Sequence, residues 1–150
     1  MAGAVRVLCL SGPNLQLLGT REPEVYGKAT LAEIHARLAA RGRDLGAEVD
    51  ARQTNHEGTL VDWIGEARAT GFAGILLNPG AYTHTSIAIH DALKAVALPC
   101  VEVHLSNPDA REPFRRRSRI ARACVGRVAG FGADSYELAL EGLMRFLSRA

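Results

Sequence analysis

The feature that most constrains the fold is a regular alternation of short apolar runs with longer segments of helical period. Five runs have the length and composition of buried strands: 5–10, 48–53, 74–77, 100–105 and 124–129. Segments with apolar residues three and four positions apart lie at 30–45, 59–70, 86–96 and 135–147. We interpret the pattern as five β-then-α units in a row, which predicts a parallel sheet covered by helices on both faces.

The composition is that of one globular domain, 1–150, large enough to bury a core. Apolar residues make up 47% of the chain and charged residues 23%, so disorder is not expected. We therefore predict a flavodoxin-like, three-layer α/β fold with a five-stranded parallel sheet. No apolar run reaches the length of a membrane span, and residues 1–4 lack the features of a signal peptide.

The three cysteines also bear on where the protein works. Cys9, Cys100 and Cys124 are odd in number and lie in or beside apolar runs. This favours buried free thiols over a disulfide framework, and predicts a cytoplasmic protein.

Polar segments follow three of the predicted strands. They occupy 11–19 after the first strand, 78–86 after the third and 106–111 after the fourth. In open parallel sheets, ligands bind beyond the carboxyl ends of the strands, so these segments are candidates for a site. Ordinary turn chemistry is the alternative interpretation, because glycine, proline and asparagine dominate loops in general.

Glu102 and His104 form an unusual pair in an otherwise apolar strand. Residues two apart in a strand share a face, so the carboxylate can fix the tautomer of the imidazole and favour its protonated form. The pair is a candidate general acid with its orienting group. A purely structural pair at a strand end is an equally good interpretation of these residues alone.

The segment 19–27 is long and polar for a connection between a strand and a helix, and glycines lie at both of its ends. It has the character of a lid. Arg21 and Tyr26 lie close together within it, and a nearby positive charge favours a phenolate, which can act as a base. Alternatively, Tyr26 is a surface aromatic beside a solvated arginine.

The sequence lacks the motifs that are typical of metal sites or nucleotide-binding sites. It contains no HExxH, CxxC, GxGxxG or GxxxxGK[ST] motif. Seven of its 18 basic residues are arginines between positions 111 and 127. They suit a subunit interface or an anionic substrate. The net charge is only +2 and no aromatic residues alternate with the arginines, so neither nucleic acid nor a membrane surface is a predicted partner.

Five blocks of sequence together resemble the type II 3-dehydroquinate dehydratases: residues 12–15, 21–27, 78–86, 102–107 and 111–115. The resemblance extends from about Val5 to the last predicted helix. It implies dehydration of 3-dehydroquinate to 3-dehydroshikimate without a cofactor, in the shikimate route or in quinate breakdown. It also implies a dodecamer built from trimers.

The resemblance assigns catalytic roles to five residues. Tyr26 corresponds to the base that removes the proton α to the ketone, and Arg21 to the group that keeps it ionised. Asn14 corresponds to the donor that stabilises the enolate through a bound water. His104 corresponds to the acid that protonates the leaving hydroxyl, and Glu102 to the group that orients it.

The resemblance also implies a set of substrate contacts. The substrate carboxylate would bind the backbone N–H groups of Leu105 and Ser106, with Asn78 beside them. The ring hydroxyls would contact His84 and Arg115. Asp91 corresponds to a binding residue that one subunit supplies to its neighbour.

Three positions qualify the resemblance. Gln16 stands where asparagine is common, Arg119 stands where an aromatic residue is expected, and the role of Arg111 stays open. The alternative class of protein is a non-catalytic flavodoxin-like module that binds an anionic partner through its arginines. Formation of an ultraviolet-absorbing enone from dehydroquinate separates the two.

Overall fold

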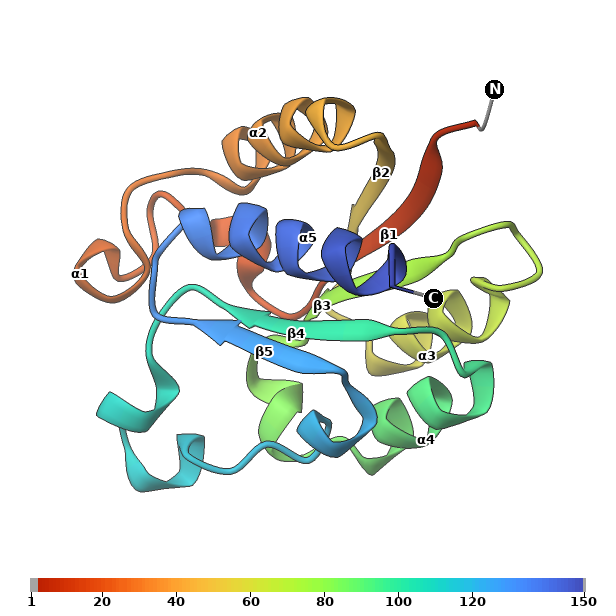
Figure 1. The fold of residues 1–150 in the computed structure, drawn as a ribbon. Helices are drawn as coiled ribbons and strands as arrows, with labels where there is room; N and C mark the ends of the chain where they lie inside the picture. The colour runs from red at the N-terminus through yellow and green to blue at the C-terminus, as the bar shows by residue number, and fades with distance from the viewer. Residues whose placement is uncertain (1–2, 150) are drawn as a thin grey trace.

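A computed structural model describes residues 3–149 and contains one five-stranded parallel sheet (Figure 1). Its strands are β1 (Val5–Ser11), β2 (Ala47–Gln53), β3 (Gly74–Asn78), β4 (Cys100–His104) and β5 (Gly126–Ala129). They lie in the order β2-β1-β3-β4-β5, and every neighbouring pair is parallel. This is the flavodoxin-like order, so the predicted fold class is confirmed.

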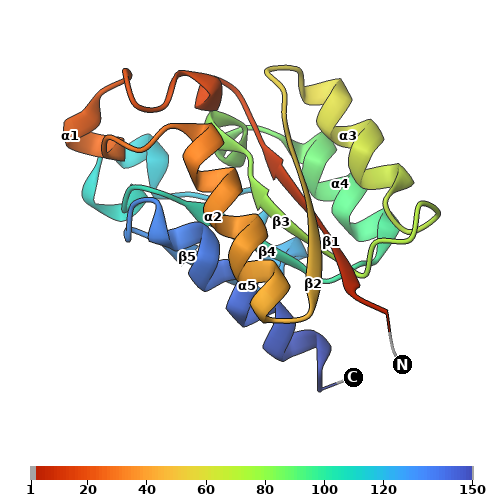
Figure 2. The same ribbon diagram turned by 90° about the horizontal axis from the view of Figure 1, so that it is seen from above.

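Four helices of ten residues or more cover the two faces of the sheet. Helices α2 (Leu31–Asp44) and α5 (Asp134–Leu147) lie on one face, and α3 (Glu57–Glu66) and α4 (Ile87–Val96) on the other (Figure 2). At the start of α2 the Thr30 hydroxyl accepts a hydrogen bond from the Glu33 N–H at 3.2 Å, the contact that a T-x-x-E sequence makes at the beginning of a helix. Within residues 3–149, no helix combines the length and apolar character needed to cross a bilayer.

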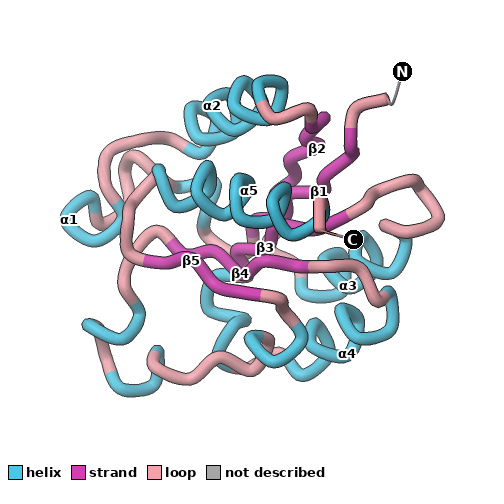
Figure 3. The backbone as a smooth tube through the Cα atoms, viewed as in Figure 1, coloured by secondary structure: helices cyan, strands magenta, loops and turns pink. Residues whose placement is uncertain are grey.

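The prediction of five β-then-α units is wrong between β4 and β5. That connection contains three 3-10 helices and no α-helix: η3 (Pro108–Ala110), η4 (Pro113–Arg115) and η5 (Ala121–Ala123) (Figure 3). Two prolines divide the segment, and the residue before a proline is disfavoured in the α conformation. Its few apolar residues also form no helical stripe, so nothing would bury a long helix there.

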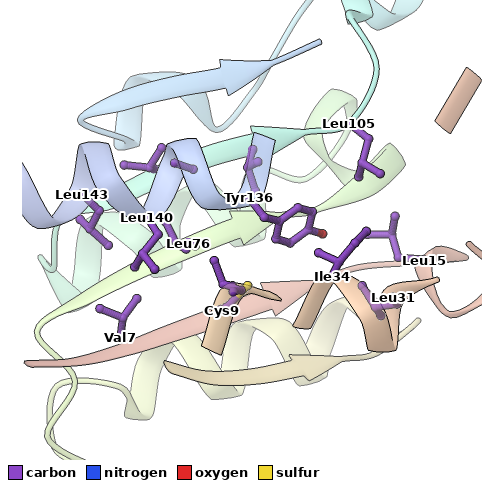
Figure 4. Close-up of a cluster of buried hydrophobic side chains, with 14 of the residues drawn as sticks. Val7, Cys9, Leu15, Leu31, Ile34, Leu76, Leu105, Tyr136, Leu140 and Leu143 are labelled. Carbon is purple, nitrogen blue, oxygen red and sulfur yellow. The ribbon is translucent and has the colours of Figure 1, made fainter. Parts of the chain in front are cut away.

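Two apolar layers, one on each face of the sheet, make up the core. Along β1, Val7 and Cys9 face α2 and α5 (Figure 4). Leu8 and Leu10 alternate with them and face α3 and α4. All four side chains are buried, which explains why the strands read as continuous apolar runs. Burial raises the pKa of the Cys9 thiol to about 12, so this thiol stays protonated and unreactive. All three cysteines are free, as predicted.

The ends of β1 and β3 meet at one edge of the sheet, where backbone touches backbone. The Gly12 N–H donates to the Asn78 carbonyl at 2.8 Å. A Cβ atom on Gly12 would lie 2.7 Å from the carbonyl oxygen of Pro79. The two loops can approach this closely only because residue 12 has no side chain.

We predict that Gly12→Ala lowers the free energy of unfolding by at least about 2 kcal/mol, because the backbone of the facing loop must move. The control is Gly142→Ala in α5, where a new Cβ meets nothing within 4 Å. This change should raise stability by about 1 kcal/mol, the difference in helix propensity. Urea denaturation measures both. Equal effects of the two substitutions would contradict the close approach.

Candidate active site

A cavity of about 240 Å³ opens beyond the carboxyl ends of β1, β3 and β4. Nine of the eleven predicted site residues line it: Asn14, Arg21, Tyr26, Asn78, His84, His104, Leu105, Ser106 and Arg115. They come from four stretches of the chain that the parallel strands bring to one edge of the sheet. Glu102 lies behind His104, outside the lining, and Asp91 lies elsewhere.

Tyr26 enters the cavity from the segment predicted as a lid. It ends a one-turn helix, α1 (Pro23–Tyr26), and is buried. Nη2 of Arg21 donates to the Tyr26 hydroxyl at 3.2 Å, and the guanidinium carbon lies 4.5 Å from the ring centre. Arg111, whose role the sequence left open, places its guanidinium carbon 5.1 Å from the same ring. Two permanent positive charges therefore face one phenol ring.

Both ends of the lid segment are glycines with a positive φ, a backbone conformation that glycine adopts without strain. Gly19 has φ +95° and Gly27 has φ +83°, values that other residues rarely adopt. Tyr26 lies between these two points, so its position depends on both turns.

His104 and Glu102 make a short contact at the end of β4. Nε2 of His104 lies 2.5 Å from Oε2 of Glu102. Nδ1 is therefore the ring nitrogen left for other partners, and His104 lines the cavity. Burial alone would raise the pKa of the Glu102 carboxyl, but the hydrogen bond from His104 and the charges of His104 and Arg127 outweigh it and lower that pKa. Glu102 is a buried carboxylate anion.

Sequence analysis missed three further partners of this carboxylate. The Thr83 hydroxyl donates to Oε2 at 3.0 Å, and the Ser118 hydroxyl donates to Oε1 at 2.9 Å. Arg127 on β5 forms an ion pair with Oε1 at 3.0 Å. Thr83 lies in the block 78–86 that carries the family resemblance, but the sequence does not show that Thr83, Ser118 or Arg127 contacts Glu102, because that contact exists only in the folded chain.

Asn78 is held by a second buried network that the sequence did not reveal. Its Nδ2 donates to the Tyr136 hydroxyl at 3.0 Å, and its Oδ1 accepts from the Gly80 N–H at 3.1 Å. The Tyr136 hydroxyl also shares a 2.8 Å hydrogen bond with Ser11. Burial, the largest influence, raises the pKa of Tyr136, so its hydroxyl stays neutral. These contacts hold the Asn78 amide in one orientation.

The remaining binding candidates also have defined partners. Nδ1 of His84 lies 2.9 Å from the Arg117 carbonyl oxygen. Nε of Arg115 pairs with Glu112 at 2.7 Å, and Nη1 of Arg111 donates to the Ser106 hydroxyl at 3.3 Å. These contacts hold three side chains at the rim of the cavity.

The two departures from the family pattern lie outside the cavity lining. The Gln16 side chain accepts a hydrogen bond from Nε2 of Gln53 at 3.0 Å, and Gln53 also donates to the Gly12 carbonyl. Arg119 lies in a separate surface depression with His90 and Asp91. The Asp91 side chain on α4 is 73% exposed, so the chain does not bring it to its own cavity.

The described residues, 3–149, contain no group of three or more histidine, cysteine, aspartate or glutamate side chains that could hold a metal ion. What the cavity offers is a buried phenol facing cations, and an imidazole backed by a carboxylate. This arrangement can remove a proton at one point and deliver one at another.

Comparison with known proteins agrees with this chemistry. The family model described as "Dehydroquinase class II" matches residues 5–144. A 3-dehydroquinate dehydratase of Rhodopseudomonas palustris is 58% identical over 137 residues, 91% of each chain. One of Caulobacter vibrioides is 56% identical over 91% of this chain and 94% of its own. The crystal structure of type II dehydroquinase from Butyrivibrio crossotus aligns with a TM-score of 0.91 and 40% identity, covering 93% of this chain and 97% of that one.

The flavodoxin-like fold, the phenol and imidazole that line one cavity, and these relatives together define a hydro-lyase. The chain belongs to the class II dehydroquinase family. The identification made from the sequence is confirmed, and the alternative of a non-catalytic binding module is wrong.

The buried network under Asn78 leads to a stability prediction. Tyr136→Phe should lower the free energy of unfolding by about 1–3 kcal/mol, because it leaves the Asn78 amide and the Ser11 hydroxyl short of a buried partner. The matched control is Tyr82→Phe, which removes an exposed hydrogen bond to the Asn55 carbonyl and should cost less than about 1 kcal/mol. Urea denaturation compares the two, and a smaller loss for Tyr136→Phe than for Tyr82→Phe would contradict the network.

Proposed function

We propose that this hydro-lyase converts 3-dehydroquinate to 3-dehydroshikimate by an anti elimination through an enolate, in the shikimate pathway or in quinate breakdown. One observation carries the proposal: Tyr26, facing two guanidinium groups, and His104, backed by Glu102, line the same cavity. The names of the relatives supply the substrate. The free cysteines suit the reducing cytoplasm in which we expect the enzyme to work.

Tyr26 is the base in this proposal. Its phenolate removes the proton α to the ketone, and the charges of Arg21 and Arg111 stabilise that phenolate before the proton arrives. The electrons of the broken C–H bond move onto the carbonyl oxygen and form the enolate. Asn14, at the end of β1, stabilises the enolate oxygen through a bound water.

His104 is the acid. Its Nε2 is engaged by Glu102, so Nδ1 delivers the proton to the β-hydroxyl, which leaves as water when the enolate collapses. One proton leaves carbon for Tyr26 and one leaves His104 for oxygen, so the step needs no electron carrier. We accordingly propose no cofactor and no metal.

Substrate binding uses the remaining lining residues. The backbone N–H groups of Leu105 and Ser106 bind the substrate carboxylate, with the Asn78 amide beside them. His84 and Arg115 contact the ring hydroxyls. All five line the cavity, and the positive charges around it suit an anionic substrate.

We also propose that the chain works as a homo-oligomer, a dodecamer built from trimers, as the family resemblance implies. The exposure of Asp91, and its place in a surface depression separate from the cavity, support its role as a residue supplied by a neighbouring copy. No nucleic acid or membrane partner is part of the proposal.

The division of labour between Tyr26 and His104 can be tested with a matched pair of variants. Tyr26→Phe should lose both enone formation and exchange of the α-hydrogen with deuterated water, because the base is gone. His104→Ala should keep the exchange while dehydration falls by about 10²–10⁴, the usual contribution of a general acid. Ultraviolet absorbance follows the enone, and mass spectrometry of recovered dehydroquinate follows the exchange.

Either of two results would refute these assignments. One is Tyr26→Phe retaining more than about a tenth of wild-type activity, a barrier change below roughly 1.4 kcal/mol. The other is His104→Ala dehydrating at the wild-type rate. A wild-type enzyme that forms no enone would refute the proposed reaction itself.

Sharing of Asp91 between copies predicts complementation. Asp91→Ala and Tyr26→Phe should each be inactive alone, but co-expressed chains should recover activity. Some hybrid sites then combine an intact Tyr26 with an intact Asp91 from a neighbour. Sedimentation should show no dominant 16.1 kDa species. A clean monomer, or no recovery in mixed oligomers, would contradict the sharing.

A further inference from the structure

The Glu102 carboxylate has more partners than its role as the orienting group of His104 requires. Its side chain has no exposed surface, yet it is an anion. Burying an isolated carboxylate is costly unless it is paired and hydrogen-bonded. His104, Thr83 and Ser118 supply hydrogen bonds, but both hydroxyls are neutral, and His104 is the group that gives up its proton in the proposed reaction.

Arg127 is the one permanent cation in contact with this carboxylate among residues 3–149. It lies directly opposite Glu102 in the pairing of β4 with β5. Its Nε is 3.0 Å from Oε1, and its Nη2 donates to Oε2 at 3.2 Å, so the guanidinium makes a bidentate contact with the carboxylate. Arg127 does not line the cavity, and its side chain is one-third exposed at the edge of the sheet.

The two cations beside Glu102 differ in what happens to them during turnover. In the proposed reaction His104 carries the proton that it will donate, Arg127 is a permanent cation, and the Glu102 carboxylate is negative. Once His104 has given its proton to the leaving hydroxyl, its ring is neutral. Only Arg127 then balances the buried charge of Glu102. Without it, proton transfer would leave an uncompensated buried anion, and the proton would be held more tightly.

We propose that Arg127 is a positioning residue for the dehydration: it is the counter-ion that lets Glu102 remain a carboxylate while His104 gives its proton away. The inference rests on the proposed function, because it presupposes that His104 is the acid. Arg127 acts through Glu102 and touches neither the substrate nor the cavity.

Other titratable groups surround the pair, and none of them can substitute for Arg127. Cys100 lies on the same strand as Glu102, and its pKa is raised, through a hydrogen bond with Cys124 first and burial second, so it stays neutral. The charged and titratable side chains that face His104 belong to the cavity lining: Arg21, Tyr26, His84, Arg111 and Arg115. None of these five forms a hydrogen bond or an ion pair with Glu102, whose contacts are His104, Thr83, Ser118 and Arg127.

The test compares Arg127→Gln with two controls. Arg127→Lys keeps the positive charge but cannot make the two-pronged guanidinium contact with both oxygens of Glu102. Arg116→Gln removes one exposed charge from the same basic stretch without touching Glu102. For each variant we would measure kcat and KM for enone formation across pH, α-hydrogen exchange and thermal unfolding. In Arg127→Gln, kcat should fall by about tenfold or more, because His104 then holds its proton more tightly and is a weaker general acid. KM should change by less than about twofold, because binding is not involved.

The pH profile distinguishes this role from simple structural support. Dehydration needs a protonated His104, so its rate declines at high pH. Losing the counter-ion should move this decline upward by about one pH unit, because the imidazolium is then favoured. Exchange of the α-hydrogen should continue, since Tyr26 is untouched. Arg127→Lys should lose less than about threefold in kcat, and Arg116→Gln should match the wild type.

A double-mutant cycle keeps the proposal falsifiable even if Arg127→Gln fails to fold. Glutamine at position 102 carries no charge, so it needs no counter-ion. Arg127→Gln in the Glu102→Gln background should change kcat by less than about twofold relative to Glu102→Gln alone. A full loss in that background would overturn the proposal, as would an unchanged pH profile in a folded Arg127→Gln enzyme. Enone formation by the wild type is the separate control for the proposed reaction.

Discussion

One buried carboxylate, that of Glu102, contacts several separate segments of the chain that form the active site. Glu102 receives hydrogen bonds or ion pairs from β4, from η2 (Gly80–His84), from the loop at Ser118 and from β5. Because its side chain is fully buried, each of these segments must be in place for the anion to be tolerated. The position of the imidazole is therefore determined jointly by four parts of the chain, and a displacement of any one of them changes the acid.

The parallel sheet explains why the other reactive groups lie near this carboxylate. In the order β2-β1-β3-β4-β5, the connection after β1 leads to β2 on one side, whereas the connection after β3 leads to β4 on the other side. The direction of the connections therefore reverses between β1 and β3. Loops that leave these two strands separate at that point and leave a crevice at the strand ends. The backbone contact between Gly12 and Asn78 joins the ends of the two strands next to the cavity, and Asn78 and the lid residues Arg21 and Tyr26 line it.

Much of this could be predicted from the sequence, and the reasons for success and failure are physical. Apolar periodicity predicted the strands and the longer helices because burial on both faces leaves a continuous signal along the chain. It failed between β4 and β5, where prolines and scattered apolar residues leave only 3-10 turns. Asp91 was assigned to the site by resemblance, and the isolated chain does not bring it to the cavity.

Supporting residues such as Arg127 and Tyr136 were missed, because strand register and helix packing, which the sequence does not state, create their roles. Tyr136 also links the site to the order in which the chain is synthesised. It lies in α5, the last helix, and supplies the hydroxyl that holds Ser11 and Asn78. A ribosome therefore supplies the hydroxyl that supports Ser11 and Asn78 only after it has made every residue that lines the cavity. Nascent chains that stop before α5 would expose the apolar face of the sheet and carry no organised site.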